Sequence, residues 1–253
     1  MKTIAITPVF NEENVIISVL DRIKRHVDLL IVSNDGSTDE TEALIEAWRQ
    51  DKQGVYVITA RKNGGASMAL KKGYALVAHL LNTEVIEPAD AVVEIDSDGQ
   101  HDPDYIPSLV ERFVAARENR VILARRGFSN YPFVKVWGNR FLTAVASVLS
   151  GTRYHDVESN YRVMAARVFP ELIQYFWGYR YSGAFEVGII LGRLGYQTDN
   201  TFVVNVPYYR AGSRAIDGFH VVAAGIVAWA KVVTRRPHPA IDEFLRGTLS
   251  EVT

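Results

Sequence analysis

Short apolar runs alternate with amphipathic segments through the first half of the chain. Runs rich in Val, Ile and Leu predict strands at 3–9, 28–35, 55–59, 91–96 and 121–124. Apolar residues that recur every three or four positions predict helices between them, at 11–26, 40–50, 69–81 and 108–118. Strands that alternate with helices are typical of the α/β class. We therefore expect a mostly parallel, Rossmann-like sheet with helices on both faces.

The second half is less regular. The pattern predicts two helices and a strand, at 133–149, 165–176 and 201–206. The segment 218–233 is apolar nearly all round, which is typical of a helix that is buried or lies in lipid. We expect one domain over 1–215 and a C-terminal apolar helix and tail over 216–253. Core packing, a homo-oligomer interface and membrane-surface contact all remain open for this last part.

Helix starts are predicted from polar residues next to the apolar patterns. Asn11 is a plausible N-cap of the first helix, and Thr38 or Asp39 of the second. Pro107 is typical of the opening of the fourth helix.

Polar residues follow the predicted strands at their carboxyl ends. They lie at 8–11, 34–35, 61–63, 96–98 and 125–126. Because ligands of open α/β sheets bind beyond the carboxyl ends of the strands, we expect these residues to converge on one rim.

Composition excludes several classes of protein. With 48% hydrophobic and 23% charged residues, the chain has the composition of a globular protein and not of a disordered one. A net charge of −1 argues against nucleic-acid binding. There is no cysteine, and therefore no thiolate metal site or Cys nucleophile. We see no secretory leader and no apolar run of ~18 residues, so we expect a cytoplasmic protein, peripheral at most on the cytoplasmic face of a membrane.

The stretch after the fourth strand is rich in oxygen ligands. Asp96, Asp98 and Gln100 could place two carboxylates and an amide oxygen on one side, a set that suits Mg²⁺ or Mn²⁺. An EF-hand loop is excluded, because its sixth and twelfth positions would be His101 and Pro107. The alternative for the aspartates is a solvated turn. His101 could also be a metal ligand, but a hydrogen-bonding loop residue is the favoured interpretation.

Several stretches together resemble a known family. TPVFNEE (7–13), IVSNDGSTDET (31–41), KNGGASMALKKGY (62–74) and EIDSDGQHDPDYIP (94–107) are similar, in order and spacing, to family-2 glycosyltransferases of the GT-A fold. The subgroup that they resemble most is the polyprenyl-phosphate sugar transferases, which include the dolichol-phosphate mannosyltransferases. The resemblance extends over roughly the first 215 residues and implies a single GT-A domain.

The resemblance implies a donor site at the rim. Its nucleotide-sugar-binding residues would be Pro8, Phe10, Asn11, Glu12, Asp35, Asp96, Ser97 and Asp98, with Arg210 and Arg214 in a loop that closes over the donor. Asp96, Asp98 and Gln100 would hold the metal on the diphosphate. Arg126 would face the phosphates.

The resemblance also implies an acceptor side. Asp156, Ser159 and Arg162 match the family motif D-x-x-S-G-[FY]-R. Three positions depart from the family pattern, namely Asn34, Ser67 and Asn160. Asn34 puts the selectivity for the nucleotide base in doubt, and Asn160 puts the shape of the acceptor pocket in doubt.

The residues on the acceptor side bear on the kind of acceptor. A hydroxyl acceptor needs a general base, for which Asp156 and Glu186 are the candidates. A polyprenyl phosphate is already anionic and needs cations instead, and Arg126, Lys135, Arg140 and Arg162 could supply them. The cations favour the phosphate acceptor, although Arg140 is equally typical of a solvated surface residue.

The sequence thus predicts a metal-dependent, inverting transferase. It would move a hexose from a nucleotide sugar of the GDP-mannose or UDP-glucose type to a polyprenyl phosphate. One alternative is a soluble or glycan hydroxyl acceptor, and the other is a non-catalytic nucleotide-sugar-binding module.

Overall fold

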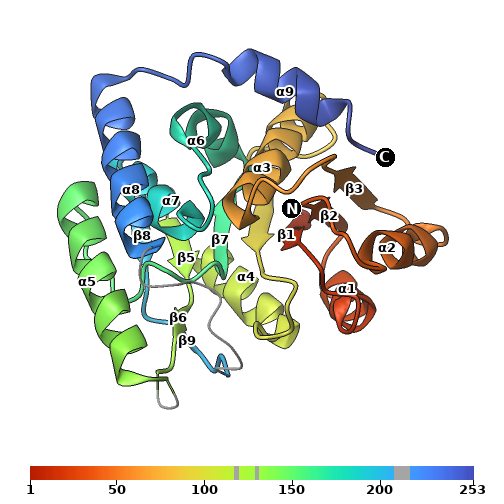
Figure 1. The fold of residues 1–253 in the computed structure, drawn as a ribbon, viewed down its shortest axis with the longest axis horizontal. Helices are drawn as coiled ribbons and strands as arrows, with labels where there is room; N and C mark the ends of the chain where they lie inside the picture. The colour runs from red at the N-terminus through yellow and green to blue at the C-terminus, as the bar shows by residue number, and fades with distance from the viewer. Residues whose placement is uncertain (117–119, 129–130, 208–216) are drawn as a thin grey trace.

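A seven-stranded sheet forms the centre of the molecule (Figure 1). The computed structural model describes residues 1–116, 120–128, 131–207 and 217–253. The strands are β1 (Thr3–Val9), β2 (Leu29–Asn34), β3 (Val55–Thr59), β4 (Ala91–Glu94), β5 (Arg120–Leu123), β7 (Arg162–Ala165) and β8 (Gln197–Asp199). Their spatial order is β3-β2-β1-β4-β7-β5-β8.

The sheet is mostly parallel, as predicted. Strands β1 to β4 pair in parallel, and β5 pairs with β8 in parallel. Strand β7 is antiparallel to both of its neighbours, β4 and β5. Because β7 lies between β4 and β5, it brings residues from later in the chain into the sheet.

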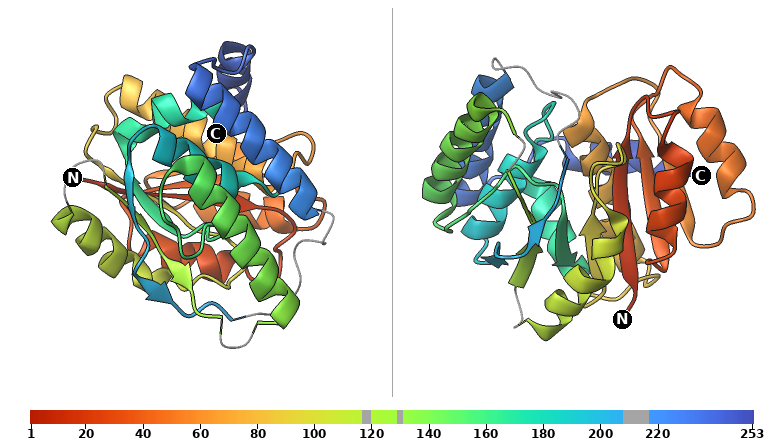
Figure 2. Two further views of the ribbon diagram at one scale, coloured as in Figure 1. Left: turned by 90° about the vertical axis from the view of Figure 1, so that its left-hand side faces the viewer. Right: turned by 90° about the horizontal axis from the view of Figure 1, so that it is seen from below.

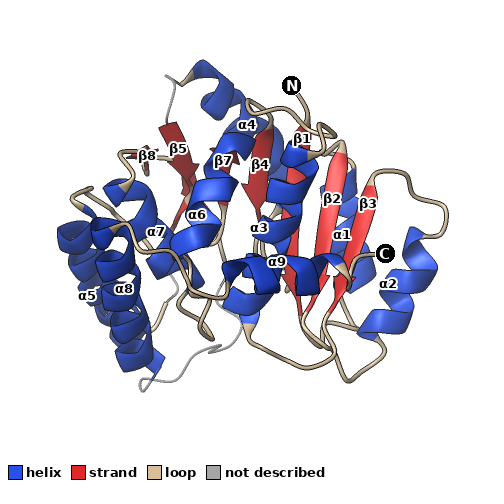
Figure 3. Cartoon of the chain, turned by 90° about the horizontal axis from the view of Figure 1, so that it is seen from above, coloured by secondary structure: helices blue, strands red, loops and turns tan. Residues whose placement is uncertain are grey.

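Helices cover both faces of the sheet (Figure 3). One face packs against α3 (Ala66–Asn82), α6 (Phe169–Tyr175), α7 (Gly183–Arg193) and α9 (Ile241–Leu249). The other face packs against α1 (Ile16–Lys24), α2 (Thr41–Arg49) and α4 (Ile106–Ala115), the last preceded by the short helix η1 (Pro103–Tyr105). A second short helix, η2 (Ala166–Val168), follows β7. The predicted layers are thus confirmed.

Two long helices, α5 (Phe133–Ser150) and α8 (Asp217–Thr234), lie side by side at one end of the molecule (Figures 1 and 2). Both contact α7. The approach of α8 is close, because a Cβ at Gly225 would lie 2.2 Å from the ring of Phe185. Among the described residues, no helix combines the length and the apolar character that crossing a bilayer requires.

The start of the first helix was predicted wrongly. Helix α1 begins at Ile16, and Asn11 has a left-handed φ of 54°. The Asn11 side chain bonds Thr38 instead, accepting from its N–H at 2.8 Å. In the second helix, Asp39 accepts a bond from the N–H of Thr41, as a capping residue would.

The later elements were predicted only in part. The helix expected over 133–149 is confirmed as α5. The helix expected over 165–176 is wrong in its first residues, because β7 ends at Ala165 and α6 begins at Phe169. Of the strand expected over 201–206, only β9 (Val203–Val204) is formed, and it pairs with β6 (Arg125–Arg126) in a second, two-stranded sheet.

Candidate functional site

A cleft of about 1400 Å³ opens beyond the carboxyl ends of β1, β2 and β4 and extends between α5 and α8. The predicted rim and site residues that line it are Pro8, Phe10, Glu12, Asp35, Asn63, Asp96, Ser97, Asp98, Gln100 and Arg126. Lys135, from α5, lines the same cleft. The residues expected at the rim that are not among the described residues lining the cleft are Asn11, Asn34, Arg61, Lys62 and Arg125. The parallel-sheet argument therefore placed part of the rim set in the cleft. Arg210 and Arg214 lie outside the described residues.

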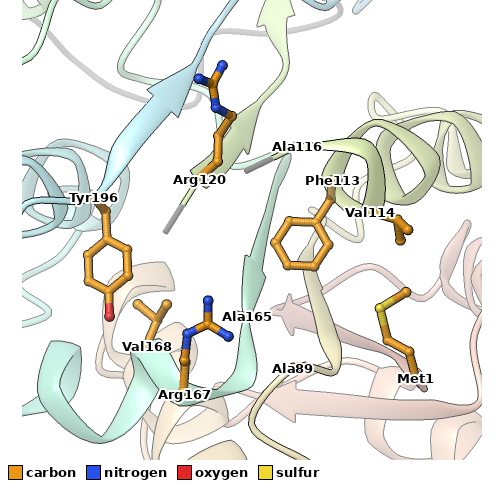
Figure 4. A pocket seen from close by; sticks show the side chains of 10 residues that line it. All are labelled: Met1, Ala89, Phe113, Val114, Ala116, Arg120, Ala165, Arg167, Val168 and Tyr196. Atoms are coloured by element: carbon orange, nitrogen blue, oxygen red, sulfur yellow. The ribbon is translucent and has the colours of Figure 1, made fainter. Parts of the chain in front are cut away.

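A second hollow, of about 180 Å³, lies near the amino ends of the parallel strands (Figure 4). Met1, Ala89 and Arg120 belong to its lining, just before or at the amino ends of β1, β4 and β5. Its described lining contains no carboxylate and no histidine.

In the donor half of the cleft, Asp35 organises the turn after β3. Its carboxylate accepts bonds from the N–H groups of Gly64 at 2.9 Å and Gly65 at 2.7 Å. Burial raises the pKa of Asp35, while these two bonds act to lower it. Asn34, the departure from the family pattern, accepts bonds from the N–H and hydroxyl of Ser37 and so closes its own turn.

Asp96 and Asp98 lie at the end of β4 and face the cleft. Burial raises the pKa of Asp96 to about 6, against the lowering effect of Asn160, Arg126 and Arg162. The Asn160 amide donates to Asp96 at 3.3 Å. Between the two aspartates, the Ser97 hydroxyl donates to the carbonyl of Pro8 at 2.7 Å and ties β4 to β1.

Gln100 lies beside Asp98 in the cleft. Its backbone and side-chain nitrogens donate to the two oxygens of Asp98, at 2.9 and 2.7 Å. These bonds orient Asp98, and the expected role of Gln100 as a third metal ligand stays a prediction. Among the described residues, no group of three or more His, Asp and Glu side chains is placed to hold a metal.

His101 has the hydrogen-bonding role that the sequence favoured. The ring is buried, stacks on Tyr161 at 5.1 Å and accepts a bond from the N–H of Asp96 at 3.3 Å. Burial lowers the pKa of His101 to about 4, so the ring is neutral at pH 7. Its contact with the Asp96 carboxylate at 3.5 Å is therefore no ion pair.

Arg126 and Asp156 form a bidentate ion pair. Arg126 donates to Asp156 through Nε and a terminal nitrogen, both at 2.9 Å, and also through its backbone N–H. Burial acts to raise the pKa of Asp156, but Arg126 outweighs it and the pKa is lowered. Asp156 is fully buried and is not among the described residues that line the cleft. It therefore holds Arg126 in place, and this geometry favours a positioning role for Asp156 over the expected role of general base.

Arg162 lies in the core and not in the cleft. It is 1% exposed, lies 3.4 Å from the Glu94 carboxylate and donates to the carbonyls of Ser159 and Ala184. Ser159 is itself buried. Arg162 and Ser159 were expected on the acceptor side, but both lie in the core here, since β7 begins at Arg162 and places it inside the sheet. Their contacts favour structural roles.

Glu186 is likewise structural. Its buried carboxylate accepts a bond from the N–H of Trp177 at 2.8 Å and others from Gly178, Tyr179 and Ser182. It is not among the described residues that line the cleft. The carboxylate stabilises the loop before α7, and these contacts favour this structural role over the acceptor or base role expected for it.

Glu158 was not predicted, although it lies within the same motif. It lines the cleft, and its buried Oε1 has no hydrogen-bond partner. Burial raises the pKa of Glu158 to about 7, with Arg126 acting against this effect. The motif marks positions 156, 159 and 162 but leaves 158 variable, so no signal in the sequence singled it out.

The charges around the cleft are unbalanced. Its described lining has five acidic side chains, from Glu12, Asp35, Asp96, Asp98 and Glu158. Two basic side chains, Arg126 and Lys135, face them. An anionic diphosphate would be repelled at the acidic end unless a cation joined it there.

Comparison with known proteins identifies the family to which the chain belongs. The family model for glycosyl transferase family 2 matches residues 4–187, a stretch that includes every strand lining the cleft. The chain belongs to this family. It is a glycosyltransferase, and the family predicted from the sequence motifs is confirmed.

The names of several similar proteins mention a polyprenyl carrier. UDP-N-acetylglucosamine–dolichyl-phosphate N-acetylglucosaminyltransferase of Methanococcus voltae is 29% identical over 206 residues, which cover 73% of this chain and 78% of the relative. Bactoprenol glucosyl transferase of Shigella phage SfX is 33% identical over 132 residues, which cover 50% of this chain and 39% of the relative.

Solved structures agree on the fold. Glucosyl-3-phosphoglycerate synthase of Mycobacterium tuberculosis, in complex with Mn²⁺, UDP-glucose and phosphoglyceric acid, superposes with a TM-score of 0.63 and 22% identity. The match covers 90% of this chain and 80% of the synthase. The predicted GT-A fold is confirmed.

Proposed function

We propose that this glycosyltransferase moves a hexose from a nucleoside diphosphate sugar to a polyprenyl phosphate, with inversion at the anomeric carbon. The observation that carries the proposal is the lining of the cleft. Acidic side chains from the strand ends, the cations Arg126 and Lys135, and apolar side chains of α5 and α8 all line it. The names of the dolichyl-phosphate and bactoprenol relatives support this acceptor class.

The acidic end suits a divalent ion. Asp96 and Asp98 supply two carboxylates, and the excess of acidic side chains disfavours a bare diphosphate. These two residues would hold Mg²⁺ or Mn²⁺, with water and phosphate oxygens as the other ligands. The ion would neutralise charge that develops on the departing diphosphate.

The chain's own residues would position the acceptor. Arg126, oriented by Asp156, presents a fixed cation to a phosphate. The acceptor phosphate oxygen would attack the anomeric carbon as the bond to the diphosphate breaks. No protein nucleophile and no deprotonation are needed. In this proposal residues 1–215 bind the donor, and 216–253 contribute α8 to the acceptor side.

One experiment tests the acceptor class. Labelled GDP-mannose, UDP-glucose and UDP-N-acetylglucosamine are each incubated with the protein, Mn²⁺ or Mg²⁺, and a polyprenyl phosphate. We expect label in the organic phase with one donor, and none with the Asp98→Ala variant. Transfer to a soluble sugar alone would contradict the proposal. An Asp98→Ala variant with full activity would contradict the proposed metal site.

A hydroxyl acceptor is the second candidate, and one observation favours it. Glu158 faces the cleft with an unpartnered carboxylate oxygen, as a general base would. The same assay decides, because this candidate requires label on a soluble or glycan acceptor.

A further inference from the structure

Helix α5 carries apolar side chains on its solvent face as well as on its protein face. Leu142, Val145 and Leu149 pack on the core. On the solvent face, Phe133 is 75% exposed, Trp137 55% and Phe141 62%. Because surface helices normally carry polar residues on the side away from the core, this outer face is suited to contact something apolar.

Helix α8 extends the same surface. Phe219, Ile226 and Val233 are exposed and lie seven residues apart, which places them on one stripe. The opposite side of α8, including Val221 and Ala228, is buried in the core. Because the two helices lie side by side, their outer faces can form one apolar surface (Figures 1 and 2).

This surface is continuous with the cleft. Phe141 of α5 and Phe219 and Ile226 of α8 are exposed, and they also line the cleft. Lys135, one turn from the start of α5, lines it as well. An apolar chain lying between the two helices would therefore lead to the cations of the cleft.

The charged residues of α5 are all basic. Residues 133–150 include Lys135 and Arg140 but no acidic residue. The Arg140 guanidinium lies 5.9 Å from the centre of the Trp137 ring, and Arg236 is exposed just beyond α8. Aromatic residues with flanking cations are typical of helices that lie in the interface of an anionic membrane.

We propose that the outer faces of α5 and α8 dock on an anionic lipid bilayer, so that a polyprenyl chain passes between the two helices into the cleft. The path of the chain rests on the acceptor class proposed above. The docking itself rests only on the exposed apolar surface and its charge.

Vesicle sedimentation tests the docking without donor or acceptor. The full chain is mixed with phosphatidylcholine vesicles, with or without phosphatidylglycerol. We expect binding that is stronger with the anionic lipid and falls about tenfold or more in the Phe133→Ser/Trp137→Ser double variant. These two rings pack together 5.8 Å apart outside the cleft lining. Val114→Ser, an equally exposed apolar site on α4, is the matched control and should bind as the wild type does.

The outcomes separate the two proposals. Vesicle binding without transfer to polyprenyl phosphate would overturn the proposed function alone. Transfer to an acceptor dispersed in detergent, with no vesicle binding by the wild type, would overturn the docking alone. Equal binding by the wild type and the double variant would overturn it too. A dimeric wild type and a monomeric double variant would also overturn the docking, because the surface would then join two copies of the chain.

Discussion

Asp156 and Arg126 show how one residue can serve the site through another. Both Asp156 oxygens are bonded to Arg126, so the carboxylate has no access to the cleft. Such a pair fixes the direction of the guanidinium. A buried pair of this kind also leaves a costly lone charge if one partner is removed.

We therefore expect Asp156→Leu to lower both the free energy of unfolding, by about 3 kcal/mol, and the transfer rate. The Arg126→Met/Asp156→Leu double variant should regain most of the stability and none of the activity. Denaturant unfolding and initial rates measure the two effects. If Asp156 were a base, a stable Asp156→Asn variant would instead lose the acid limb of the pH–rate profile.

Glu158 gives a second prediction at this scale. With a phosphate acceptor no proton has to be removed, so Glu158→Gln should lower the rate by less than about tenfold and keep the pH profile. A general base would contribute about 10²–10⁴-fold. Rates with polyprenyl phosphate from pH 6 to 9 measure this, and a loss of two orders of magnitude would favour the hydroxyl acceptor.

His101 gives a prediction on pH. Its pKa is about 4 in the folded chain, below its ordinary value of 6.5. The unfolded chain therefore binds more protons between these values, and the contribution to stability is complete above pH 6.5 and is lost towards pH 4. Relative to a His101→Gln variant, the wild type should lose about 3 kcal/mol over this range. Parallel unfolding curves for both proteins would contradict it.

The sequence allowed most of the side chains at the strand ends to be placed, but few of those expected on the acceptor side. Asp96 and Asp98 follow a strand directly, so strand direction alone places them on the rim. Arg162 and Glu186 could not be placed in this way. Their positions depend on β7 lying antiparallel in the sheet and on the loop before α7, and both are tertiary features that no local pattern encodes.

At the scale of elements, the length of the pattern decided what could be predicted. Helix α5 spans 18 residues and was found almost to its ends. Strands β7, β8 and β9 have two to four residues each, too few for a period to be read. The apolar face of α5 could not be assigned to solvent from the sequence, because apolar stripes ordinarily face the core.

The packing of α8 on α7 gives a prediction for elements. Gly225→Ala would press a methyl group on Phe185 and should destabilise the protein by about 1–3 kcal/mol, even though Ala favours a helix. Gly247→Ala in α9 meets nothing within 4 Å and should instead stabilise it, by up to about 1 kcal/mol. Thermal unfolding compares the two. Equal effects would mean that α8 is not held against α7.

At the scale of the whole molecule, the last residues are fastened to the donor half of the sheet. Thr253 and Val57 exchange backbone hydrogen bonds at 2.9 and 3.1 Å, and Val252 bridges Ile58. Helix α9 packs on α3, where Phe244 lies 4.7 Å from the Lys71 ammonium. The tail thus covers the free edge of β3, which would otherwise present unpaired backbone groups.

Graded truncation tests this contribution. A chain that ends at residue 249 loses the pairing with β3 and the ion pair of Lys72 with Glu251, and should lose about 1–2 kcal/mol of unfolding free energy. A chain that ends at residue 239 also loses α9, and should lose roughly 3 kcal/mol more, because several partly buried apolar side chains go with it. It should also associate at high concentration through the bare edge of β3.

Since no described residue after 234 lines the cleft, donor affinity below the melting temperature should stay within about twofold of the full chain. Denaturant unfolding and calorimetric titration with the donor measure the two quantities, and a loss of donor affinity in the shorter chain at full stability would contradict a purely structural role for the tail.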